Sequence, residues 1–175
     1  MIMGRELPAI ILAGALGGAA AVGLMEAAST YSSLPLSYIP FATSIVVVMG
    51  SPEASPAQPR ALIGGHLIST LIGLAVVKIA GPGPWVAALA VGLSIVAMHV
   101  TRTFHPPAGI DPLIVVVNDL SWPFLLMPVA VGACALALFA YLWHALAARV
   151  LGHAALTTSL PPDQPRAGGS DRRQA

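Results

Sequence analysis

Long and short apolar stretches alternate along the chain in a regular order. Long stretches cover residues 8–24, 61–80, 85–100 and 122–148. Their lengths lie near the roughly 20 residues that span a bilayer as an α-helix. Two shorter apolar pieces, FATSIVVVMG at 41–50 and LIVVVND at 113–119, each follow prolines. The pattern predicts an all-α polytopic fold with four long helices and two short, broken or half helices.

The two short pieces resemble each other, since Pro40 and Pro107 both lead through small or polar residues into Ile-Val-Val-Val. The order long, short, long therefore occurs twice. It divides a single transmembrane domain, 1–152, into two pseudo-repeats at about 7–81 and 84–150. Three crossings per half would give inverted topology, a 3+3 repeat typical of transporters. A chance match between two Val-rich runs is the competing interpretation.

Each short piece needs an extended partner to cross a bilayer. A helix from Pro107 to Asn118 covers about 18 Å at 1.5 Å per residue. Residues 102–106 in extended form add about 13 Å, which brings the sum near the roughly 30 Å hydrocarbon thickness. We therefore expect a break near the midplane, although a re-entrant loop is the alternative.

The placement of arginines favours six crossings. With both termini on one side, Arg60, Arg102 and Arg149 share that side, as the positive-inside rule requires. Re-entrant pieces would put Arg60 and Arg102 on the opposite side. We therefore predict that both termini are cytoplasmic.

Composition sets the class of protein. The 175 residues are 57% hydrophobic and 9% charged, whereas soluble domains carry about 25% charged residues. We expect an integral membrane protein, in a bacterial inner membrane, surrounded by membrane lipids. The net charge of +1 gives no reason to expect nucleic acid as a partner. The polar residues 153–175 predict a disordered cytoplasmic tail.

The sequence FHPPAG at 104–109 should break a helix inside the membrane. A helix that begins there presents free N–H groups and a positive partial charge, which favour an anion. We expect a substrate-binding site for a small inorganic anion at this break, with hydroxyls of the other short helix opposite. Its residues are His105, Pro106, Pro107, Ala108 and Gly109, together with Thr43 and Ser44. A proline kink without a ligand is the competing interpretation.

Three ionisable residues complete the candidate site. His66 lies in a long segment, where an ionisable side chain is costly and marks a functional candidate, unless it reaches the interface. Arg102 precedes His105 by three residues and could attract anions toward the break. Asp111 could weaken anion binding or carry a coupling proton. It also supports an alternative function, a channel or transporter for a neutral or cationic solute, and Asp111-Pro112 is a second candidate helix start.

Enzyme and metal functions have weaker support. Ser69 and His66 share a helix face, but a nucleophile and base need a third orienting group that the spacing does not supply. His66, His99 and His105 could converge on a metal or haem, but no ligand-spacing motif such as H-E-x-x-H occurs. We therefore expect no catalytic residues, no metal and no cofactor.

HPPAG, together with PFATSIVVVMGSP at 40–52 and AQPRALIGGHLIST at 57–70, resembles the HPP family of integral membrane proteins. The resemblance covers about 7–149. The family is described with four membrane helices, which matches the long segments alone. Its plant members are implicated in nitrite transport across the chloroplast envelope, so the resemblance implies transport of a nitrite-like anion. The chain departs from the family pattern at Ala61 and at 110–112. A homo-oligomer is left open, since the sequence shows no interface.

Overall fold

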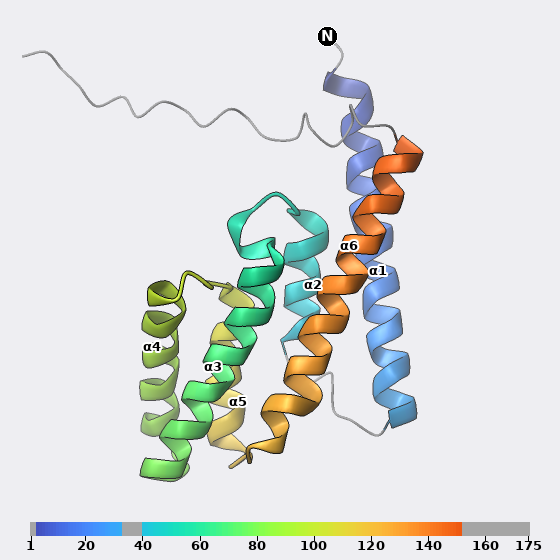
Figure 1. The fold of residues 1–175 in the computed structure, drawn as a ribbon. Coiled ribbons are helices and arrows are strands. Elements are labelled where there is room, and N and C mark those ends of the chain that lie inside the picture. The colour runs from blue at the N-terminus through green and yellow to red at the C-terminus, as the bar shows by residue number, and fades with distance from the viewer. Residues whose placement is uncertain (1–2, 33–39, 152–175) are drawn as a thin grey trace, which may run out of the picture.

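A computed structural model describes residues 3–32 and 40–151, and these residues form an all-α bundle that lacks strands (Figure 1). In chain order the elements are α1 (Met3–Ser32), α2 (Phe41–Gly50), η2 (Ser55–Ala57), α3 (Pro59–Ala80), α4 (Pro84–Val100), η3 (Pro106–Ile110), α5 (Asp111–Val117), η4 (Leu125–Ala130) and α6 (Val131–Leu151). The predicted all-α membrane fold is confirmed. The predicted tail lies outside the described residues.

Helix length separates two kinds of segment, as predicted. Within the described residues, three apolar helices are long enough to cross a membrane: 7–31, 59–80 and 125–150. The fourth long segment, α4, has 17 residues and rises about 26 Å. The two predicted short pieces are the 10-residue α2 and the η3–α5 pair at 106–117.

The two short helices run in opposite directions, and η3 and α5 pack against α3 (Figure 1). From its start beside α3, α2 leads toward the η2 turn at one end of the bundle, while η3 and α5 lead toward the other end. When the short pieces are counted, successive segments alternate in direction: α1 and α3 run one way and α4 and α6 the other, and α1 and α6 lie side by side. This arrangement is the one that six crossings require. The sequence repeat itself stays a prediction.

Proline and glycine explain several helix ends, but two ends depend on other residues. Pro59 and Pro84 occupy first-turn positions, where a missing N–H costs nothing. After α4, Arg102 adopts a left-handed conformation with φ of 56°. The N–H of Thr103 bonds Met98 O at 2.9 Å, which completes a Schellman motif. The extended run expected at 102–106 is therefore wrong at both ends, since Arg102 is left-handed and Pro106 already begins η3, although His105 is extended. Asp119 closes α5 in the same way, with φ of 47°.

Two other predicted boundaries are wrong. The first segment continues past Leu24 to Ser32, because no proline interrupts it before Pro35 and the hydroxyl of Thr30 bonds Glu26 O within the helix. The last long segment begins irregularly, with π-helical η4 before α6. Met127 has extended φ/ψ there, a conformation that the ring of the following Pro128 favours for the preceding residue.

Two apolar clusters lie on either side of α3 and leave a polar seam between them. One joins α1, α2, η4 and α6 around Phe41, Ile45 and Val129, and it includes Leu62 near the start of α3. The other joins α3, α4 and α5 around Leu74 and Val115. The buried polar side chains gather between the clusters, and they include Ser44, His66, Ser69, Thr70, His105 and Asp111.

Substitution of Gly73 by Ala tests the close approach of α3 and α5. A Cβ at Gly73 would lie 2.8 Å from Pro112 Cα, a backbone atom that cannot move aside alone. We expect Gly73→Ala to lower the unfolding free energy by about 1–3 kcal/mol. The midpoint of thermal unfolding in detergent measures the change. As the matched control, Gly92→Ala meets no described atom within 4 Å and should be neutral or slightly stabilising; equal midpoints for both variants would contradict the packing.

Candidate functional site

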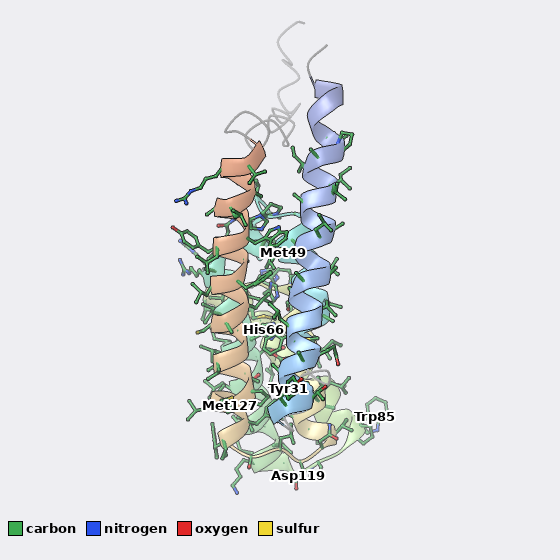
Figure 2. The ribbon with its side chains drawn as sticks, turned by 90° about the vertical axis from the view of Figure 1, so that its right-hand side faces the viewer. Tyr31, Met49, His66, Trp85, Asp119 and Met127 are labelled. Carbon is green, nitrogen blue, oxygen red and sulfur yellow. The ribbon has the colours of Figure 1, made fainter. Side chains whose placement is uncertain are left out.

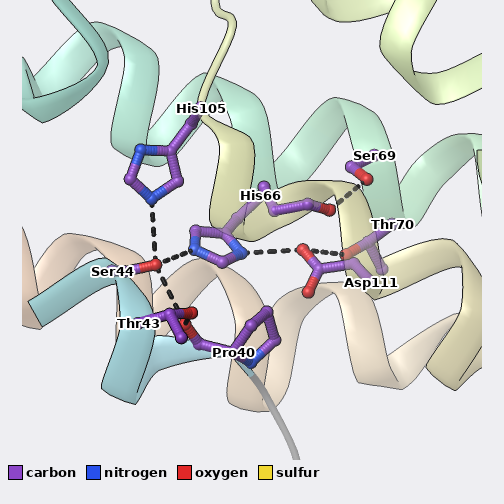
Figure 3. A network of polar contacts seen from close by, with 9 residues as sticks. Pro40, Thr43, Ser44, His66, Ser69, Thr70, His105 and Asp111 are labelled. Carbon is purple, nitrogen blue, oxygen red and sulfur yellow. Dashed lines mark hydrogen bonds and ion pairs between the residues drawn. The ribbon is translucent and has the colours of Figure 1, made fainter. Parts of the chain in front are cut away.

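Four buried side chains form a continuous hydrogen-bonded chain through the seam (Figure 3). Asp111 Oδ2 lies 2.7 Å from His66 Nδ1, and His66 Nε2 lies 2.9 Å from Ser44 Oγ. The same oxygen lies 2.9 Å from His105 Nε2, and His105 Nδ1 lies 2.7 Å from Pro56 O. The four side chains are at most 1% exposed. We call them the polar network.

Each member of the polar network comes from a different part of the fold. Ser44 lies in the first turn of α2, His66 in α3, His105 directly before η3, and Asp111 at the start of α5. The two breaks in the helical pattern therefore meet at α3. Figure 2 shows His66 toward the middle of the bundle, between Met49 nearer one end and Trp85 nearer the other.

Gly65 allows His105 to approach α3. A Cβ at this position would lie 2.6 Å from His105 Cβ and 3.0 Å from Thr103 O. Any larger residue would push the segment before η3 away from the helix. The imidazoles of His66 and His105 then lie 5.2 Å apart between ring centroids.

The surroundings of Asp111 leave one oxygen unpaired. The Thr70 hydroxyl donates to Oδ2 at 3.3 Å, while Oδ1 has no hydrogen-bond partner among the described residues. The nearby Ser69 hydroxyl donates to Ala108 O instead. An unpaired buried acceptor costs about 1–3 kcal/mol, so Oδ1 is a place where a proton donor could bind.

The hydrogen-bond partners of His105 determine its tautomer. A backbone carbonyl only accepts hydrogen bonds, so His105 Nδ1 carries a hydrogen and donates it to Pro56 O. In a neutral His105, Nε2 is then an acceptor facing Ser44. The Ser44 hydroxyl also lies 3.1 Å from Pro40 O, so three atoms compete for its single hydrogen.

The structure brings together only part of the predicted site. Ser44, His66, His105 and Asp111 meet, and His66 does not reach the interface, because it is fully buried. Pro106, Pro107, Ala108 and Gly109 form the η3 turn, in which Pro107 and Ala108 are buried. Both predicted helix starts are used, since η3 begins at Pro106 and α5 at Asp111.

Two predicted residues lie outside both the polar network and the η3 turn. Thr43 is exposed and its hydroxyl donates to Pro40 O at 2.7 Å, because one residue turns a helix by about 100° and places Thr43 on another face from Ser44. Arg102 is exposed and closes α4. Within the described residues, no three metal-binding side chains are arranged to hold an ion. His99 stacks on Phe104, with 4.2 Å between ring centroids.

Sequence reasoning missed Thr70, Phe41 and the carbonyl of Pro56. Thr70 follows His66 by four residues, so helical spacing could have placed both on one face. The Phe41 ring lies 4.9 Å from the His66 ring. A carbonyl partner such as Pro56 O leaves no signal in the sequence.

Two cavities approach the polar network without reaching it. One of about 430 Å³ lies between α1, α2 and α6, and Phe41 stands between it and His66. Gly132 provides room for this ring, since a Cβ there would lie 2.5 Å from it. The other cavity, of about 380 Å³, is lined by Glu53, Gln58 and by Ala57, the residue after Pro56. Phe41 therefore lies between His66 and the first cavity, while Pro56, the partner of His105, is followed by a residue that lines the second.

Replacement of Asp111 tests how strongly the buried pair supports the fold. Asp111→Ala leaves His66 Nδ1 without its partner, which should cost about 1–3 kcal/mol of unfolding free energy. Asp111→Asn retains an acceptor and should cost less. Thermal unfolding in detergent gives the order. The control Asp119→Asn changes an exposed turn, and its unfolding free energy should stay within about 0.5 kcal/mol of wild type. Similar losses for all three variants would contradict a stabilising role of the His66–Asp111 bond.

Comparison with known proteins agrees with the resemblance. The family model described as "HPP, transmembrane region" matches residues 4–151. Two curated transmembrane proteins of Dictyostelium discoideum are 38% identical over 108 residues and 39% identical over 101 residues. The matches cover 57% and 53% of this chain, and 35% of each relative, so the chain spans about a third of the length of these relatives. No solved structure matches. Because the family model covers every described helix, the chain belongs to the HPP family of transmembrane proteins.

Proposed function

We propose that this chain transports a small inorganic anion, nitrite-like in size and charge, through the polar network. The observation that supports the proposal is the meeting of two interrupted helices at a pair of imidazoles. Ser44 lies in the first turn of α2, and His105 directly precedes η3. The Nε2 atoms of both imidazoles point at the same hydroxyl oxygen, so these two nitrogens converge on one small volume (Figure 3).

Histidine suits an anion that must be released again. A protonated imidazole donates charge-assisted hydrogen bonds, which are roughly twice as strong as neutral ones. A neutral imidazole loses most of that attraction, so binding can be switched by one proton. The Asp111 carboxylate offsets one positive charge of the two imidazoles, so the network does not hold a permanent net positive charge.

The distribution of basic residues supports an orientation. Arg60 opens α3, Arg102 follows α4 and Arg149 lies near the end of α6, and Figure 1 shows these helix ends at the same end of the bundle. Arg60 also donates to Thr101 O at 3.0 Å, which ties two of these ends together. Lys78 lies near the other end of α3. By the positive-inside rule we assign the arginine end to the cytoplasm, in a bacterial inner membrane.

A neutral or cationic solute is the second candidate. It is favoured by the unpaired Oδ1 of Asp111, an acceptor that a hydroxyl, an ammonium group or a cation would satisfy. In that case the carboxylate, not the imidazoles, would hold the substrate.

The contacts among Ser44, His66 and Asp111 have the order of a hydrolase triad, but the surroundings favour transport. Ser44 Oγ contacts one imidazole nitrogen and Asp111 the other, as in serine hydrolases. The hydroxyl is fully buried and a second imidazole occupies its other side. The backbone N–H of Ser44 bonds Pro40 O, so it is not free to stabilise an oxyanion.

Anion flux into liposomes tests the proposed function. The full chain, reconstituted with entrapped indicator, should carry nitrite above protein-free liposomes, and nitrate, chloride and formate define its selectivity. His105→Ala should lower nitrite flux about 10–100-fold, because it removes a hydrogen bond that can carry charge. The control His99→Gln changes an exposed histidine and should retain flux.

The outcomes separate the two candidates. Absence of flux for every anion would overturn the leading proposal. Flux of ammonium or glycerol that disappears in Asp111→Asn but survives in His105→Ala would support the second candidate.

A reagent for nucleophilic serine tests the hydrolase reading. A fluorophosphonate probe should leave Ser44 unlabelled in the folded protein, since burial excludes the reagent and no N–H is placed to stabilise the developing charge. Mass spectrometry of the peptide that contains Ser44 gives the answer. Labelling that is lost in His66→Gln would favour an enzyme.

A further inference from the structure

We propose that the polar network is a proton relay that takes up one extra proton with each monovalent anion, which makes transport an electroneutral proton–anion symport. The inference rests on the proposed function and adds the coupling ion and its stoichiometry. The structural basis is the sequence of contacts Asp111–His66–Ser44–His105–Pro56, in which every link is 2.7–2.9 Å long.

The number of hydrogens in the network follows from these contacts. Each of the four links holds one hydrogen, and the hydrogen in the last link belongs to His105 Nδ1, because Pro56 O only accepts. Four hydrogens leave the network neutral overall. The charge-free form has a protonated Asp111 and two neutral imidazoles; the other forms pair the Asp111 carboxylate with one imidazolium.

The neutral forms interconvert by transfer along the links. The O–H bond of Asp111 breaks as an N–H bond forms at His66 Nδ1. The Nε2–H bond of His66 then breaks as its proton joins Ser44 Oγ, while the original hydroxyl proton of Ser44 passes to His105 Nε2. The carboxyl becomes a carboxylate and His105 becomes an imidazolium, so one proton charge has crossed from α5 to the turn before η3 with every link retained.

A fifth hydrogen has a place to go because of Pro40. Ser44 Oγ lies 3.1 Å from Pro40 O, so the serine can turn its own hydrogen to that carbonyl when both imidazoles donate to its oxygen. All five contacts are then satisfied and the network carries a charge of +1. With only three hydrogens, by contrast, one of the four links would lack a hydrogen and the network would carry a charge of −1. The network therefore alternates between four and five hydrogens.

Burial links the fifth proton to an anion. A net charge in a site that is at most 1% exposed is costly unless an opposite charge accompanies it. The titratable groups of the network are Asp111 from α5, His66 from α3 and His105 from the turn before η3, while α2 contributes a hydroxyl. Within the described residues no other titratable side chain hydrogen-bonds to these groups. One anion of charge −1 therefore balances one added proton.

Proton uptake measured beside nitrite uptake tests the coupling. Liposomes that hold the full chain and a pH-sensitive dye should take up one proton per nitrite, after subtraction of protein-free liposomes, since nitrous acid crosses bilayers unaided. A potassium diffusion potential set with valinomycin should leave the rate unchanged, whereas a pH gradient should drive uptake. Nitrite uptake without protons, or uptake that follows the membrane potential, would overturn the relay and leave the proposed function standing.

Ser44→Ala removes the bridge between the imidazoles. We expect proton-coupled flux to fall about 100-fold, the scale of a positioned proton-transfer group. The matched control is Ser94→Ala, which removes another fully buried serine hydroxyl, one that donates only to Val91 O of its own helix. Retained coupling in Ser44→Ala would overturn the relay.

Nitrogen-15 NMR of the wild-type chain with labelled histidines tests the proton relay without a transport measurement. His105, identified by the loss of its signals in His105→Gln, should keep Nδ1 protonated across the titration. The signals of His66 and His105 should titrate in coupled steps, and Ser44→Ala should make the steps independent. A neutral His105 with its hydrogen on Nε2 would overturn the relay, even if no anion were carried.

Discussion

The bond between His66 and Asp111 is the constraint on which the rest of the structure depends. A buried carboxyl group is tolerated only where a partner satisfies it, and this partner comes from the middle of α3. The bond fixes the start of α5 against α3, and the other nitrogen of His66 fixes α2 through Ser44. Two helices that begin inside the bundle are thus anchored to one continuous helix by a single imidazole.

Packing around this bond explains why the network is closed. Glycines on α3 let the opposing backbone approach, with Gly65 beneath His105 and Gly73 beneath Pro112. Apolar clusters on both sides exclude water, and the Phe41 ring covers His66 on the side of the cavity between α1, α2 and α6. Polar groups held this way are rigid, and their hydrogens are the parts that can move at low cost.

The same three side chains support different chemistry according to what surrounds them. Ser44, His66 and Asp111 have the contacts of a hydrolase triad, yet a second imidazole and complete burial leave the serine oxygen no reaction partner. With His105 added, the arrangement is symmetric about the hydroxyl, which favours passage of a proton over attack by an oxygen. In the proposed anion transport, a proton carried with the anion would remove the cost of moving charge through lipid.

Hydrophobic length and helix breakers are local properties, so the sequence alone determined the membrane class, the long and short helices, and His66 and His105 as candidates. Only tertiary structure decided which candidates meet. Thr43 and Ser44 look equivalent in the sequence, but the rotation of α2 turns one outward and the other between two imidazoles. Arg102 closes a helix where glycine is usual, and the Arg60 side chain from α3 bonds Thr101 O in the same turn. The tautomer of His105 depends on the carbonyl of Pro56, since a backbone partner from a distant segment exists only once the chain has folded.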